Sequence, residues 1–136
     1  MTDADEQTVR LSDFRGKQRV VLIFYPGDNT PVCTAQLCAF REGWEQFQAE
    51  ETAIFGVNPA NAQRHRQFAE KHKFPFPLLV DSGGKLAAAF GCRAIFGIIR
   101  RTVYAIDKRG RVIYAQRGNP APSKILAALQ NAQDAS

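Results

Sequence analysis

The stretch that decides the fold covers residues 19–33 and reads Arg19-Val20-Val21-Leu22-Ile23-Phe24-Tyr25-Pro26-Gly27-Asp28-Asn29-Thr30-Pro31-Val32-Cys33. Its first seven residues form a nearly continuous β-branched and aromatic run, which is typical of a strand covered on both faces. The next four residues are turn formers that end the strand. Thr30 and Pro31 suit the N-cap and the first position of a helix. A buried strand that leads through a short loop into a helix is therefore the first predicted unit.

The rest of the chain alternates strands and helices. The helix that begins at Thr30 carries an apolar face of Leu37, Phe40, Trp44 and Phe47. The patterns then predict a strand at 52–57, a helix at 61–73, a strand at 76–80, a helix at 85–90, a hairpin of 101–107 with 111–117, and a last helix at 123–130. Residues 1–8 read as a flexible tail and 9–11 as an edge strand. This order predicts one α/β domain over residues 1–136, with a central mixed sheet flanked by helices in a thioredoxin-like arrangement.

The composition argues against a nucleic-acid-binding, a membrane-spanning or a secreted protein. The chain has 136 residues and a net charge of +5, but its basic residues are scattered, so a nucleic-acid site is not expected. No apolar run approaches the ~20 residues that span a bilayer. The first seven residues are polar and lack the features of a secretory signal, which predicts a cytoplasmic protein. In that compartment three cysteines are expected to be free, catalytic or metal-bound rather than structural crosslinks.

Cys33 falls at the third position of the predicted helix. An anion at this position gains from the unpaired N–H groups and from the positive end of the helix dipole. Cysteines in such settings, especially beside a guanidinium, are often thiolates at neutral pH and act as nucleophiles. The alternative is a small buried core residue, since Cys33 shares a helix face with Leu37 and Phe40.

The segment from Pro26 to Cys33 follows the pattern P-x-x-x-T-x-x-C, and Cys38 follows five residues later. This closely resembles the peroxiredoxins, and within them the bacterioferritin comigratory protein or peroxiredoxin Q branch of the alkyl hydroperoxide reductase/thiol-specific antioxidant family. The likeness extends from Val9 to near the C-terminus and includes the run Arg101-Thr102-Val103-Tyr104-Ala105-Ile106-Asp107.

The resemblance implies a thiol peroxidase that reduces hydrogen peroxide and organic hydroperoxides. Cys33 would be the peroxidatic cysteine and would become a sulfenic acid. Thr30 would hydrogen-bond the peroxide, Pro26 would shield the site from water, and Arg101 would polarise the peroxide and stabilise the thiolate. Arg100 precedes Arg101, and neighbouring strand residues face opposite sides, so only one of the two can point at Cys33. The family register favours Arg101.

Cys38 is implied to be the resolving cysteine, with thioredoxin or a similar dithiol as the reductant. Five residues along a helix correspond to a Cα separation of about 8.6 Å, beyond the ~7 Å limit for a disulfide without backbone movement. A Cys33–Cys38 bridge therefore predicts local unwinding of the helix. Cys38 without a role, and Cys92 as a resolver in a later helix, remain alternatives. Cys92 is otherwise expected to be an inert thiol.

Other readings receive less support. His65 and His72 lie about 10.5 Å apart along one helix, too far to share a metal, and are expected at the surface. No metal site, nucleotide motif or other cofactor is predicted. A thioredoxin-type disulfide oxidoreductase would need C-x-x-C, and Thr30 occupies the first of those positions. A non-catalytic thioredoxin-fold binding or chaperone module is the remaining alternative. The sequence leaves open whether the protein is a monomer or a homodimer.

Overall fold

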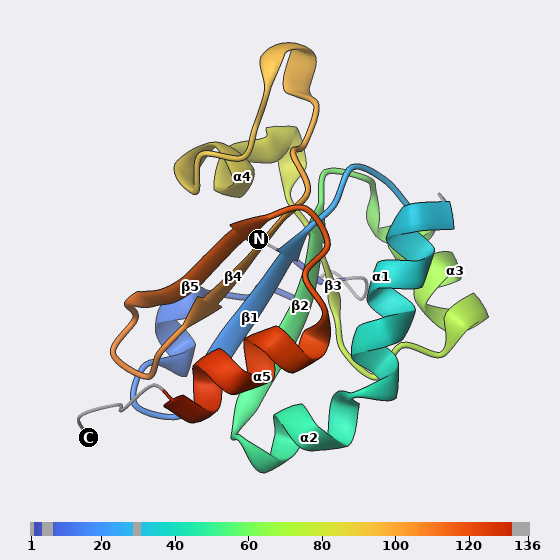
Figure 1. The fold of residues 1–136 in the computed structure, drawn as a ribbon. Helices are drawn as coiled ribbons and strands as arrows, with labels where there is room; N and C mark the ends of the chain where they lie inside the picture. The colour runs from blue at the N-terminus through green and yellow to red at the C-terminus, as the bar shows by residue number, and fades with distance from the viewer. Residues whose placement is uncertain (1, 4–6, 29–30, 132–136) are drawn as a thin grey trace.

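The computed structural model describes residues 2–3, 7–28 and 31–131. In this part of the chain, five strands form one mixed sheet in the order β3-β2-β1-β4-β5. The strands are β1 (Arg19–Phe24), β2 (Thr52–Asn58), β3 (Leu78–Val80), β4 (Thr102–Ile106) and β5 (Val112–Arg117). β1, β2 and β3 are parallel, and β4 runs antiparallel to both β1 and β5. Figure 1 shows this sheet with its helices, and the predicted α/β class with a mixed sheet is confirmed.

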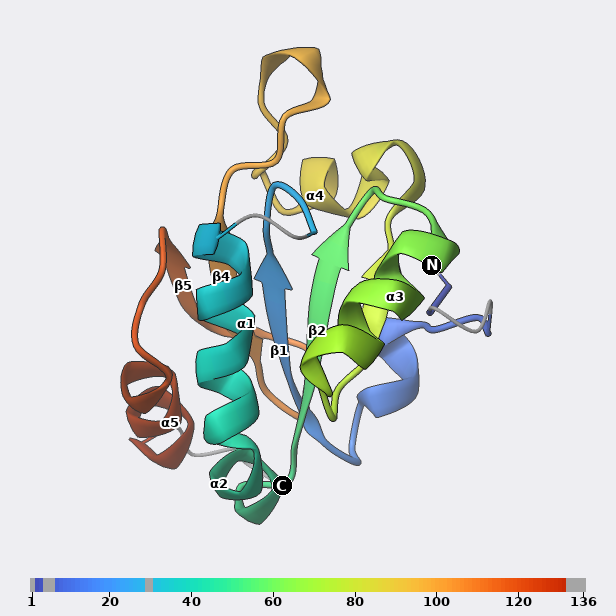
Figure 2. The same cartoon turned by 90° about the vertical axis from the view of Figure 1, so that its right-hand side faces the viewer.

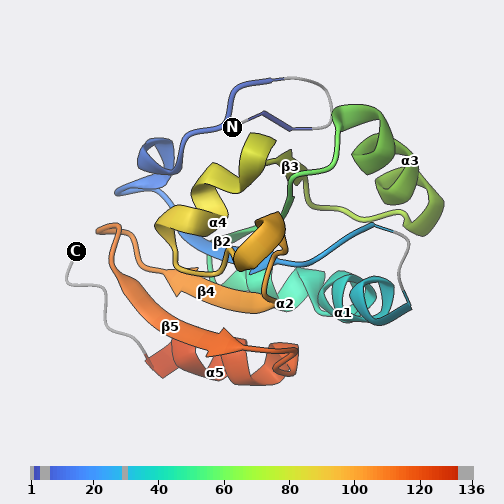
Figure 3. The ribbon, with the colours of Figure 1, turned by 90° about the horizontal axis from the view of Figure 1, so that it is seen from above.

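Helices cover both faces of the sheet. One face packs against α1 (Pro31–Glu42), α2 (Trp44–Ala49), α3 (Ala62–His72) and α5 (Pro122–Asn131), and the other packs against α4 (Lys85–Ala89) and a short 3-10 helix at Leu11–Phe14. Figure 3, seen from above, separates α1, α2 and α5 from α4 by the sheet. Side chains of β1 alternate between the two cores, since Val21 and Ile23 enter the first and Leu22 the second. The continuous apolar run of β1 thus reflects burial on both faces.

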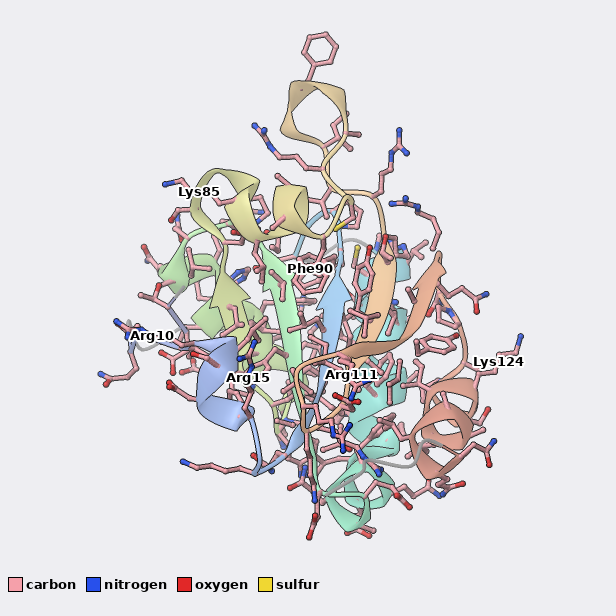
Figure 4. The ribbon with its side chains drawn as sticks, turned by 90° about the vertical axis from the view of Figure 1, so that its left-hand side faces the viewer. Arg10, Arg15, Lys85, Phe90, Arg111 and Lys124 are labelled. Carbon is pink, nitrogen blue, oxygen red and sulfur yellow. The ribbon has the colours of Figure 1, made fainter. Side chains whose placement is uncertain are left out.

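The second core is built around aromatic rings. Phe90, labelled in Figure 4, lies between α4 and the sheet, with ring centroids 5.5 Å from Phe24 and 4.9 Å from Tyr104. The same view shows Arg10 and Lys85 pointing outward on one side of the molecule and Lys124 on the opposite side. No helix of the described residues is long and apolar enough to cross a membrane.

Two local predictions were wrong. The predicted edge strand at 9–11 is absent, because the 3-10 helix begins at Leu11, and a bridge between Thr2 and Val80 lies at the edge of β3 instead. The predicted single helix across residues 30–47 is broken at Gly43, whose φ of −92° and ψ of 8° lie outside the helical region. Glycine has the greatest backbone freedom and a low helix propensity, so the chain turns there into α2.

Candidate active site

Cys33 lies at the edge of the sheet that is formed by the C-terminal ends of the parallel strands. It is the third residue of α1, follows the loop after β1, and its side chain is fully buried. The first turn of a helix leaves backbone N–H groups unpaired and carries a partial positive charge. This position therefore favours a negatively charged sulfur.

Arg101 is the guanidinium that meets this sulfur. Its Nη2 donates to Cys33 Sγ at 3.1 Å. Arg101 stands immediately before β4, and the antiparallel register pairs Thr102 with Phe24, so the arginine lies beside the end of β1. Arg100 is exposed, and its backbone N–H donates to Cys92 O. The structure therefore places Arg101, and not Arg100, against Cys33.

Gln36 is a member of the site that sequence reasoning missed. It is fully buried in α1, one turn after Cys33, and its Oε1 accepts a hydrogen bond of 2.7 Å from Arg101 Nη1. The two terminal nitrogens of Arg101 are thus held by two residues of the same helix turn. Gln36 Nε2 is the one buried side-chain nitrogen or oxygen of the described residues without a hydrogen-bond partner. The i, i+3 spacing from Cys33 was the available signal, since such residues share a helix face.

The remaining residues of the P-x-x-x-T-x-x-C pattern are placed differently. Pro26 is exposed in the loop after β1, and the first two residues of α1, Pro31 and Val32, are exposed as well. Thr30 lies outside the described residues, so its predicted contact with the peroxide stays a prediction.

The prediction that both histidines lie at the surface was wrong for His65. His65 is fully buried, and its Nδ1 lies 2.7 Å from Asp28 Oδ2, while His72 is half-buried at the end of α3. Phe68 and His65 are the buried residues of α3. They lie three residues apart and therefore face the core together. The sequence placed His65 at the surface because nothing in it revealed a buried carboxyl partner for the imidazole.

Residues 1–115 match the AhpC/TSA family. The chain belongs to the AhpC/TSA family. It is 42% identical to Peroxiredoxin Bcp of Bacillus subtilis over 137 residues, covering 96% of this chain and 87% of that protein. It is 40% identical to the chloroplastic Peroxiredoxin Q of Triticum aestivum over 128 residues, covering 93% of this chain. The chain spans 58% of the length of that wheat protein.

Solved structures agree with this membership. Peroxidoxin BcpB from Mycobacterium tuberculosis superposes with a TM-score of 0.90 at 30% identity, covering 98% of this chain and 92% of the other. Xanthomonas campestris Peroxiredoxin Q gives a TM-score of 0.88 at 27% identity, with 95% and 87% covered. The resemblance inferred from the Pro26–Cys33 motif and the thioredoxin-like fold are therefore both confirmed.

In this AhpC/TSA member, Cys38 lies on the same helix as Cys33. All three cysteines are free thiols, and Cys38 is half-buried. Ideal helix geometry separates the Cα atoms of Cys33 and Cys38 by about 8.6 Å, too far for a disulfide. A hydrogen bond to Glu42 raises the pKa of the Arg41 guanidinium, and the neighbouring Cys38 raises it further.

Cys92 lies on the other face of the sheet. It belongs to the second core, whereas Cys33 belongs to the first, and its Sγ–H donates to Ala87 O at 3.4 Å. Burial raises the pKa of the Cys92 thiol to about 11. A thiol that is protonated at neutral pH and separated from Cys33 by the sheet is poorly placed to attack it. Among the described residues, no group of three or more His, Cys, Asp or Glu side chains could hold a metal ion.

Proposed function

We propose that the protein is a thiol peroxidase that reduces hydrogen peroxide and organic hydroperoxides with Cys33 as the peroxidatic residue. The observation that carries this proposal is the 3.1 Å hydrogen bond from Arg101 Nη2 to Cys33 Sγ at the first turn of α1. A cation and a helix N-terminus together stabilise a thiolate, which is the nucleophilic form of cysteine. The relatives named peroxiredoxin support the same activity.

The first half-reaction transfers one oxygen atom. The Cys33 thiolate attacks one oxygen of the hydroperoxide, the O–O bond breaks, and the other oxygen leaves as an alkoxide or hydroxide that takes up a proton. Cys33 becomes a sulfenic acid. A hydroperoxide carries no charge, so the rate depends on donors oriented toward the breaking bond. Arg101 supplies such donors, and Thr30 is proposed as a further one, while Pro26 is proposed to limit the access of water.

The second half-reaction forms a disulfide. The Cys38 sulfur attacks Cys33 Sγ, the S–S bond forms, and the sulfenic oxygen leaves as water. The separation of about 8.6 Å requires α1 to unwind around these residues first. Beyond Cys38 the helix is anchored, because Phe40 is buried and Arg41 Nη1 donates to His72 O at 2.6 Å. The unwinding is therefore proposed for the first turns of α1. Thioredoxin or a similar dithiol would then reduce the bridge by thiol exchange.

Rapid mixing with hydrogen peroxide, and separately with an organic hydroperoxide, tests the activity. The reduced protein should consume one equivalent of peroxide in a fast phase, and Cys33→Ser should abolish that phase. A wild-type protein that consumes no peroxide would refute the proposal. Peptide mapping after one equivalent of peroxide tests the resolving step, with a Cys33–Cys38 linkage expected. A linkage to Cys92 or to another chain would instead assign a different resolver.

A further inference from the structure

A buried carboxyl group holds the loop between β1 and α1. Asp28 is 3% exposed and lies in the same loop as Pro26. Its Oδ1 accepts a hydrogen bond of 2.6 Å from the Tyr25 hydroxyl, and its Oδ2 lies 2.7 Å from His65 Nδ1. Burying a carboxyl group is costly unless it is hydrogen-bonded. These two contacts therefore favour one conformation of the loop.

His65 connects that loop to two neighbouring strands. Its Nε2 lies 3.2 Å from Asn58 O, at the end of β2, and 3.1 Å from Leu79 O in β3. Carbonyl oxygens only accept hydrogen bonds, so Nε2 must carry a hydrogen. The imidazole thus ties the ends of two parallel strands to the loop that follows the third. Figure 2 shows the ends of β1 and β2 next to each other, between α1 and α3.

The contact between His65 Nδ1 and Asp28 Oδ2 also needs one proton, because two bare lone pairs 2.7 Å apart would repel each other. That proton can lie on the nitrogen, giving an imidazolium and a carboxylate, or on the oxygen, giving two neutral groups. Both forms carry no net charge, and in both forms every polar atom of the pair is satisfied. A fully satisfied polar cluster rigidifies its surroundings.

Tyr25 completes the cluster on the side of Cys33. The pKa of Tyr25 is raised well above its usual value, first by burial, then by the neighbouring Asp28 and the hydrogen bond to it, and last by the neighbouring Cys33. Its hydroxyl therefore stays a donor. Asn58 Nδ2 donates to Tyr25 O at 2.8 Å, and a Cβ on Gly56 would lie 3.2 Å from Tyr25 Cε1. The backbone and the ring of Tyr25 are both fixed, and the ring shares a core with Cys33.

We propose that Tyr25, Asp28 and His65 form a positioning network that fixes the loop carrying Pro26 relative to Cys33. This inference rests on the proposed peroxidase function and deepens it. Arg101, immediately before β4, reaches the sulfur from one side of β1, and the network holds the loop from β2 and β3, on the other side. The three residues act on the reaction through the loop.

The wild-type protein provides the first test. Nitrogen-15 NMR of labelled histidine reports which ring nitrogens carry hydrogen. The network requires a hydrogen on His65 Nε2 and a second proton in the bond between Nδ1 and Asp28. His72, the second histidine of the chain, supplies the reference signal. A bare Nε2 would overturn the hydrogen-bond pattern and with it the proposal.

Variants provide the second test. His65→Leu removes the link and is expected to slow the reaction with hydrogen peroxide about 10–100-fold, the range expected for misplaced reacting groups. In Asp28→Asn, the amide Nδ2 can donate to Nδ1 while Oδ1 accepts from Tyr25. This variant keeps the pattern without the charge, so its rate should exceed that of His65→Leu at least about tenfold. His72→Leu is the matched control and should react at the wild-type rate.

The outcomes separate the two proposals. A wild-type protein without peroxide turnover refutes the peroxidase function, whatever the NMR signals show. A folded His65→Leu variant with the wild-type rate refutes the network alone, and so does an Asp28→Asn variant as slow as His65→Leu. If circular dichroism shows that His65→Leu is unfolded, Tyr25→Phe replaces it, because only one hydroxyl is lost. Tyr25→Phe should be about 3–10-fold slower in the peroxide reaction, and an unchanged rate would overturn the inference.

Discussion

Replacing Gln36 with leucine should separate the stability of the protein from its catalysis. Gln36 is fully buried and makes one hydrogen bond, in which its Oε1 accepts from Arg101 Nη1 at 2.7 Å. Its Nε2 has no partner among the described residues. The side chain therefore makes one strong hydrogen bond, through Oε1, and also buries one unsatisfied donor, Nε2. Leucine has a similar volume and removes both.

The two effects on stability are of similar size. Losing a hydrogen bond to a charged group costs about 1.5–3 kcal/mol, whereas removing a buried unsatisfied donor gains about 1–3 kcal/mol. The free energy of unfolding of Gln36→Leu should thus stay within about 1 kcal/mol of the wild-type value. The effect of Gln36→Leu on the reaction rate has no such opposing contribution. Arg101 keeps its position at Cys33 through two anchors, and the loss of one permits a displacement of about 1 Å, enough to cost up to about 100-fold in rate.

Two measurements decide between these effects. Urea unfolding, followed by the fluorescence of Trp44, the single tryptophan, gives the free energy of unfolding. Stopped-flow mixing with hydrogen peroxide gives the rate of Cys33 oxidation, expected to fall about 10–100-fold. Gln46→Leu, at an exposed position of α2, is the matched control for the amide-to-leucine change. A Gln36→Leu variant that loses more than about 2 kcal/mol of stability but keeps the wild-type rate would refute the reasoning.

Three further predictions concern single sites. Arg101→Lys keeps the charge but cannot donate to Gln36 and Cys33 with a rigid fork, so peroxide reduction in stopped flow should fall about 100-fold. Burial raises the pKa of Cys92 from 9.0 to about 11, so as pH rises the unfolded chain loses this proton before the folded protein does. The free energy of unfolding should therefore fall as pH rises from 9.0 to about 11. Cys92→Ala should flatten that part of the urea-unfolding profile, and an unchanged slope would contradict the assignment. Gly56→Ala would place Cβ 2.6 Å from Leu78 Cδ2, so thermal unfolding should show a loss of about 1–3 kcal/mol.

The sequence predicted those parts of the fold that depend on local patterns. The apolar run of β1 and the Pro31 helix start are both found, because burial on two faces and helix capping leave direct marks on residue type. The turn between β4 and β5 is also found, with Arg111 N–H donating to Asp107 Oδ1. The break at Gly43 was missed, since the apolar spacing continued across it. The spacing of apolar residues does not reveal that a single residue between them has non-helical backbone angles.

The site was predictable only where a motif or register named the residue. Cys33 followed from its place at the start of the predicted helix, and Arg101 followed from its register in the family that the chain resembles. Gln36 and His65 did not, because their roles depend on partners 65 and 37 residues away in the chain. A glutamine or a histidine in a polar-looking helix is usually exposed, and only the assembled fold shows which one meets a buried guanidinium or carboxyl group.

The contacts at the two ends of α1 explain how the site can be rigid and yet permit the proposed local unwinding. Arg101 donates hydrogen bonds to Cys33 and Gln36 in the first turns of α1. These two hydrogen bonds favour the helical form of α1 that is seen with reduced cysteines. In the proposed mechanism, oxidation of Cys33 removes the thiolate charge that strengthens the Arg101 contact, so this contact weakens at the step when the helix has to open. The last turn stays bound through Arg41 and His72 O, and the loop before α1 stays bound through Asp28. The segment proposed to unwind is thus limited at both ends, and the weakening of the Arg101 contact follows from the proposed conversion of Cys33 to a sulfenic acid.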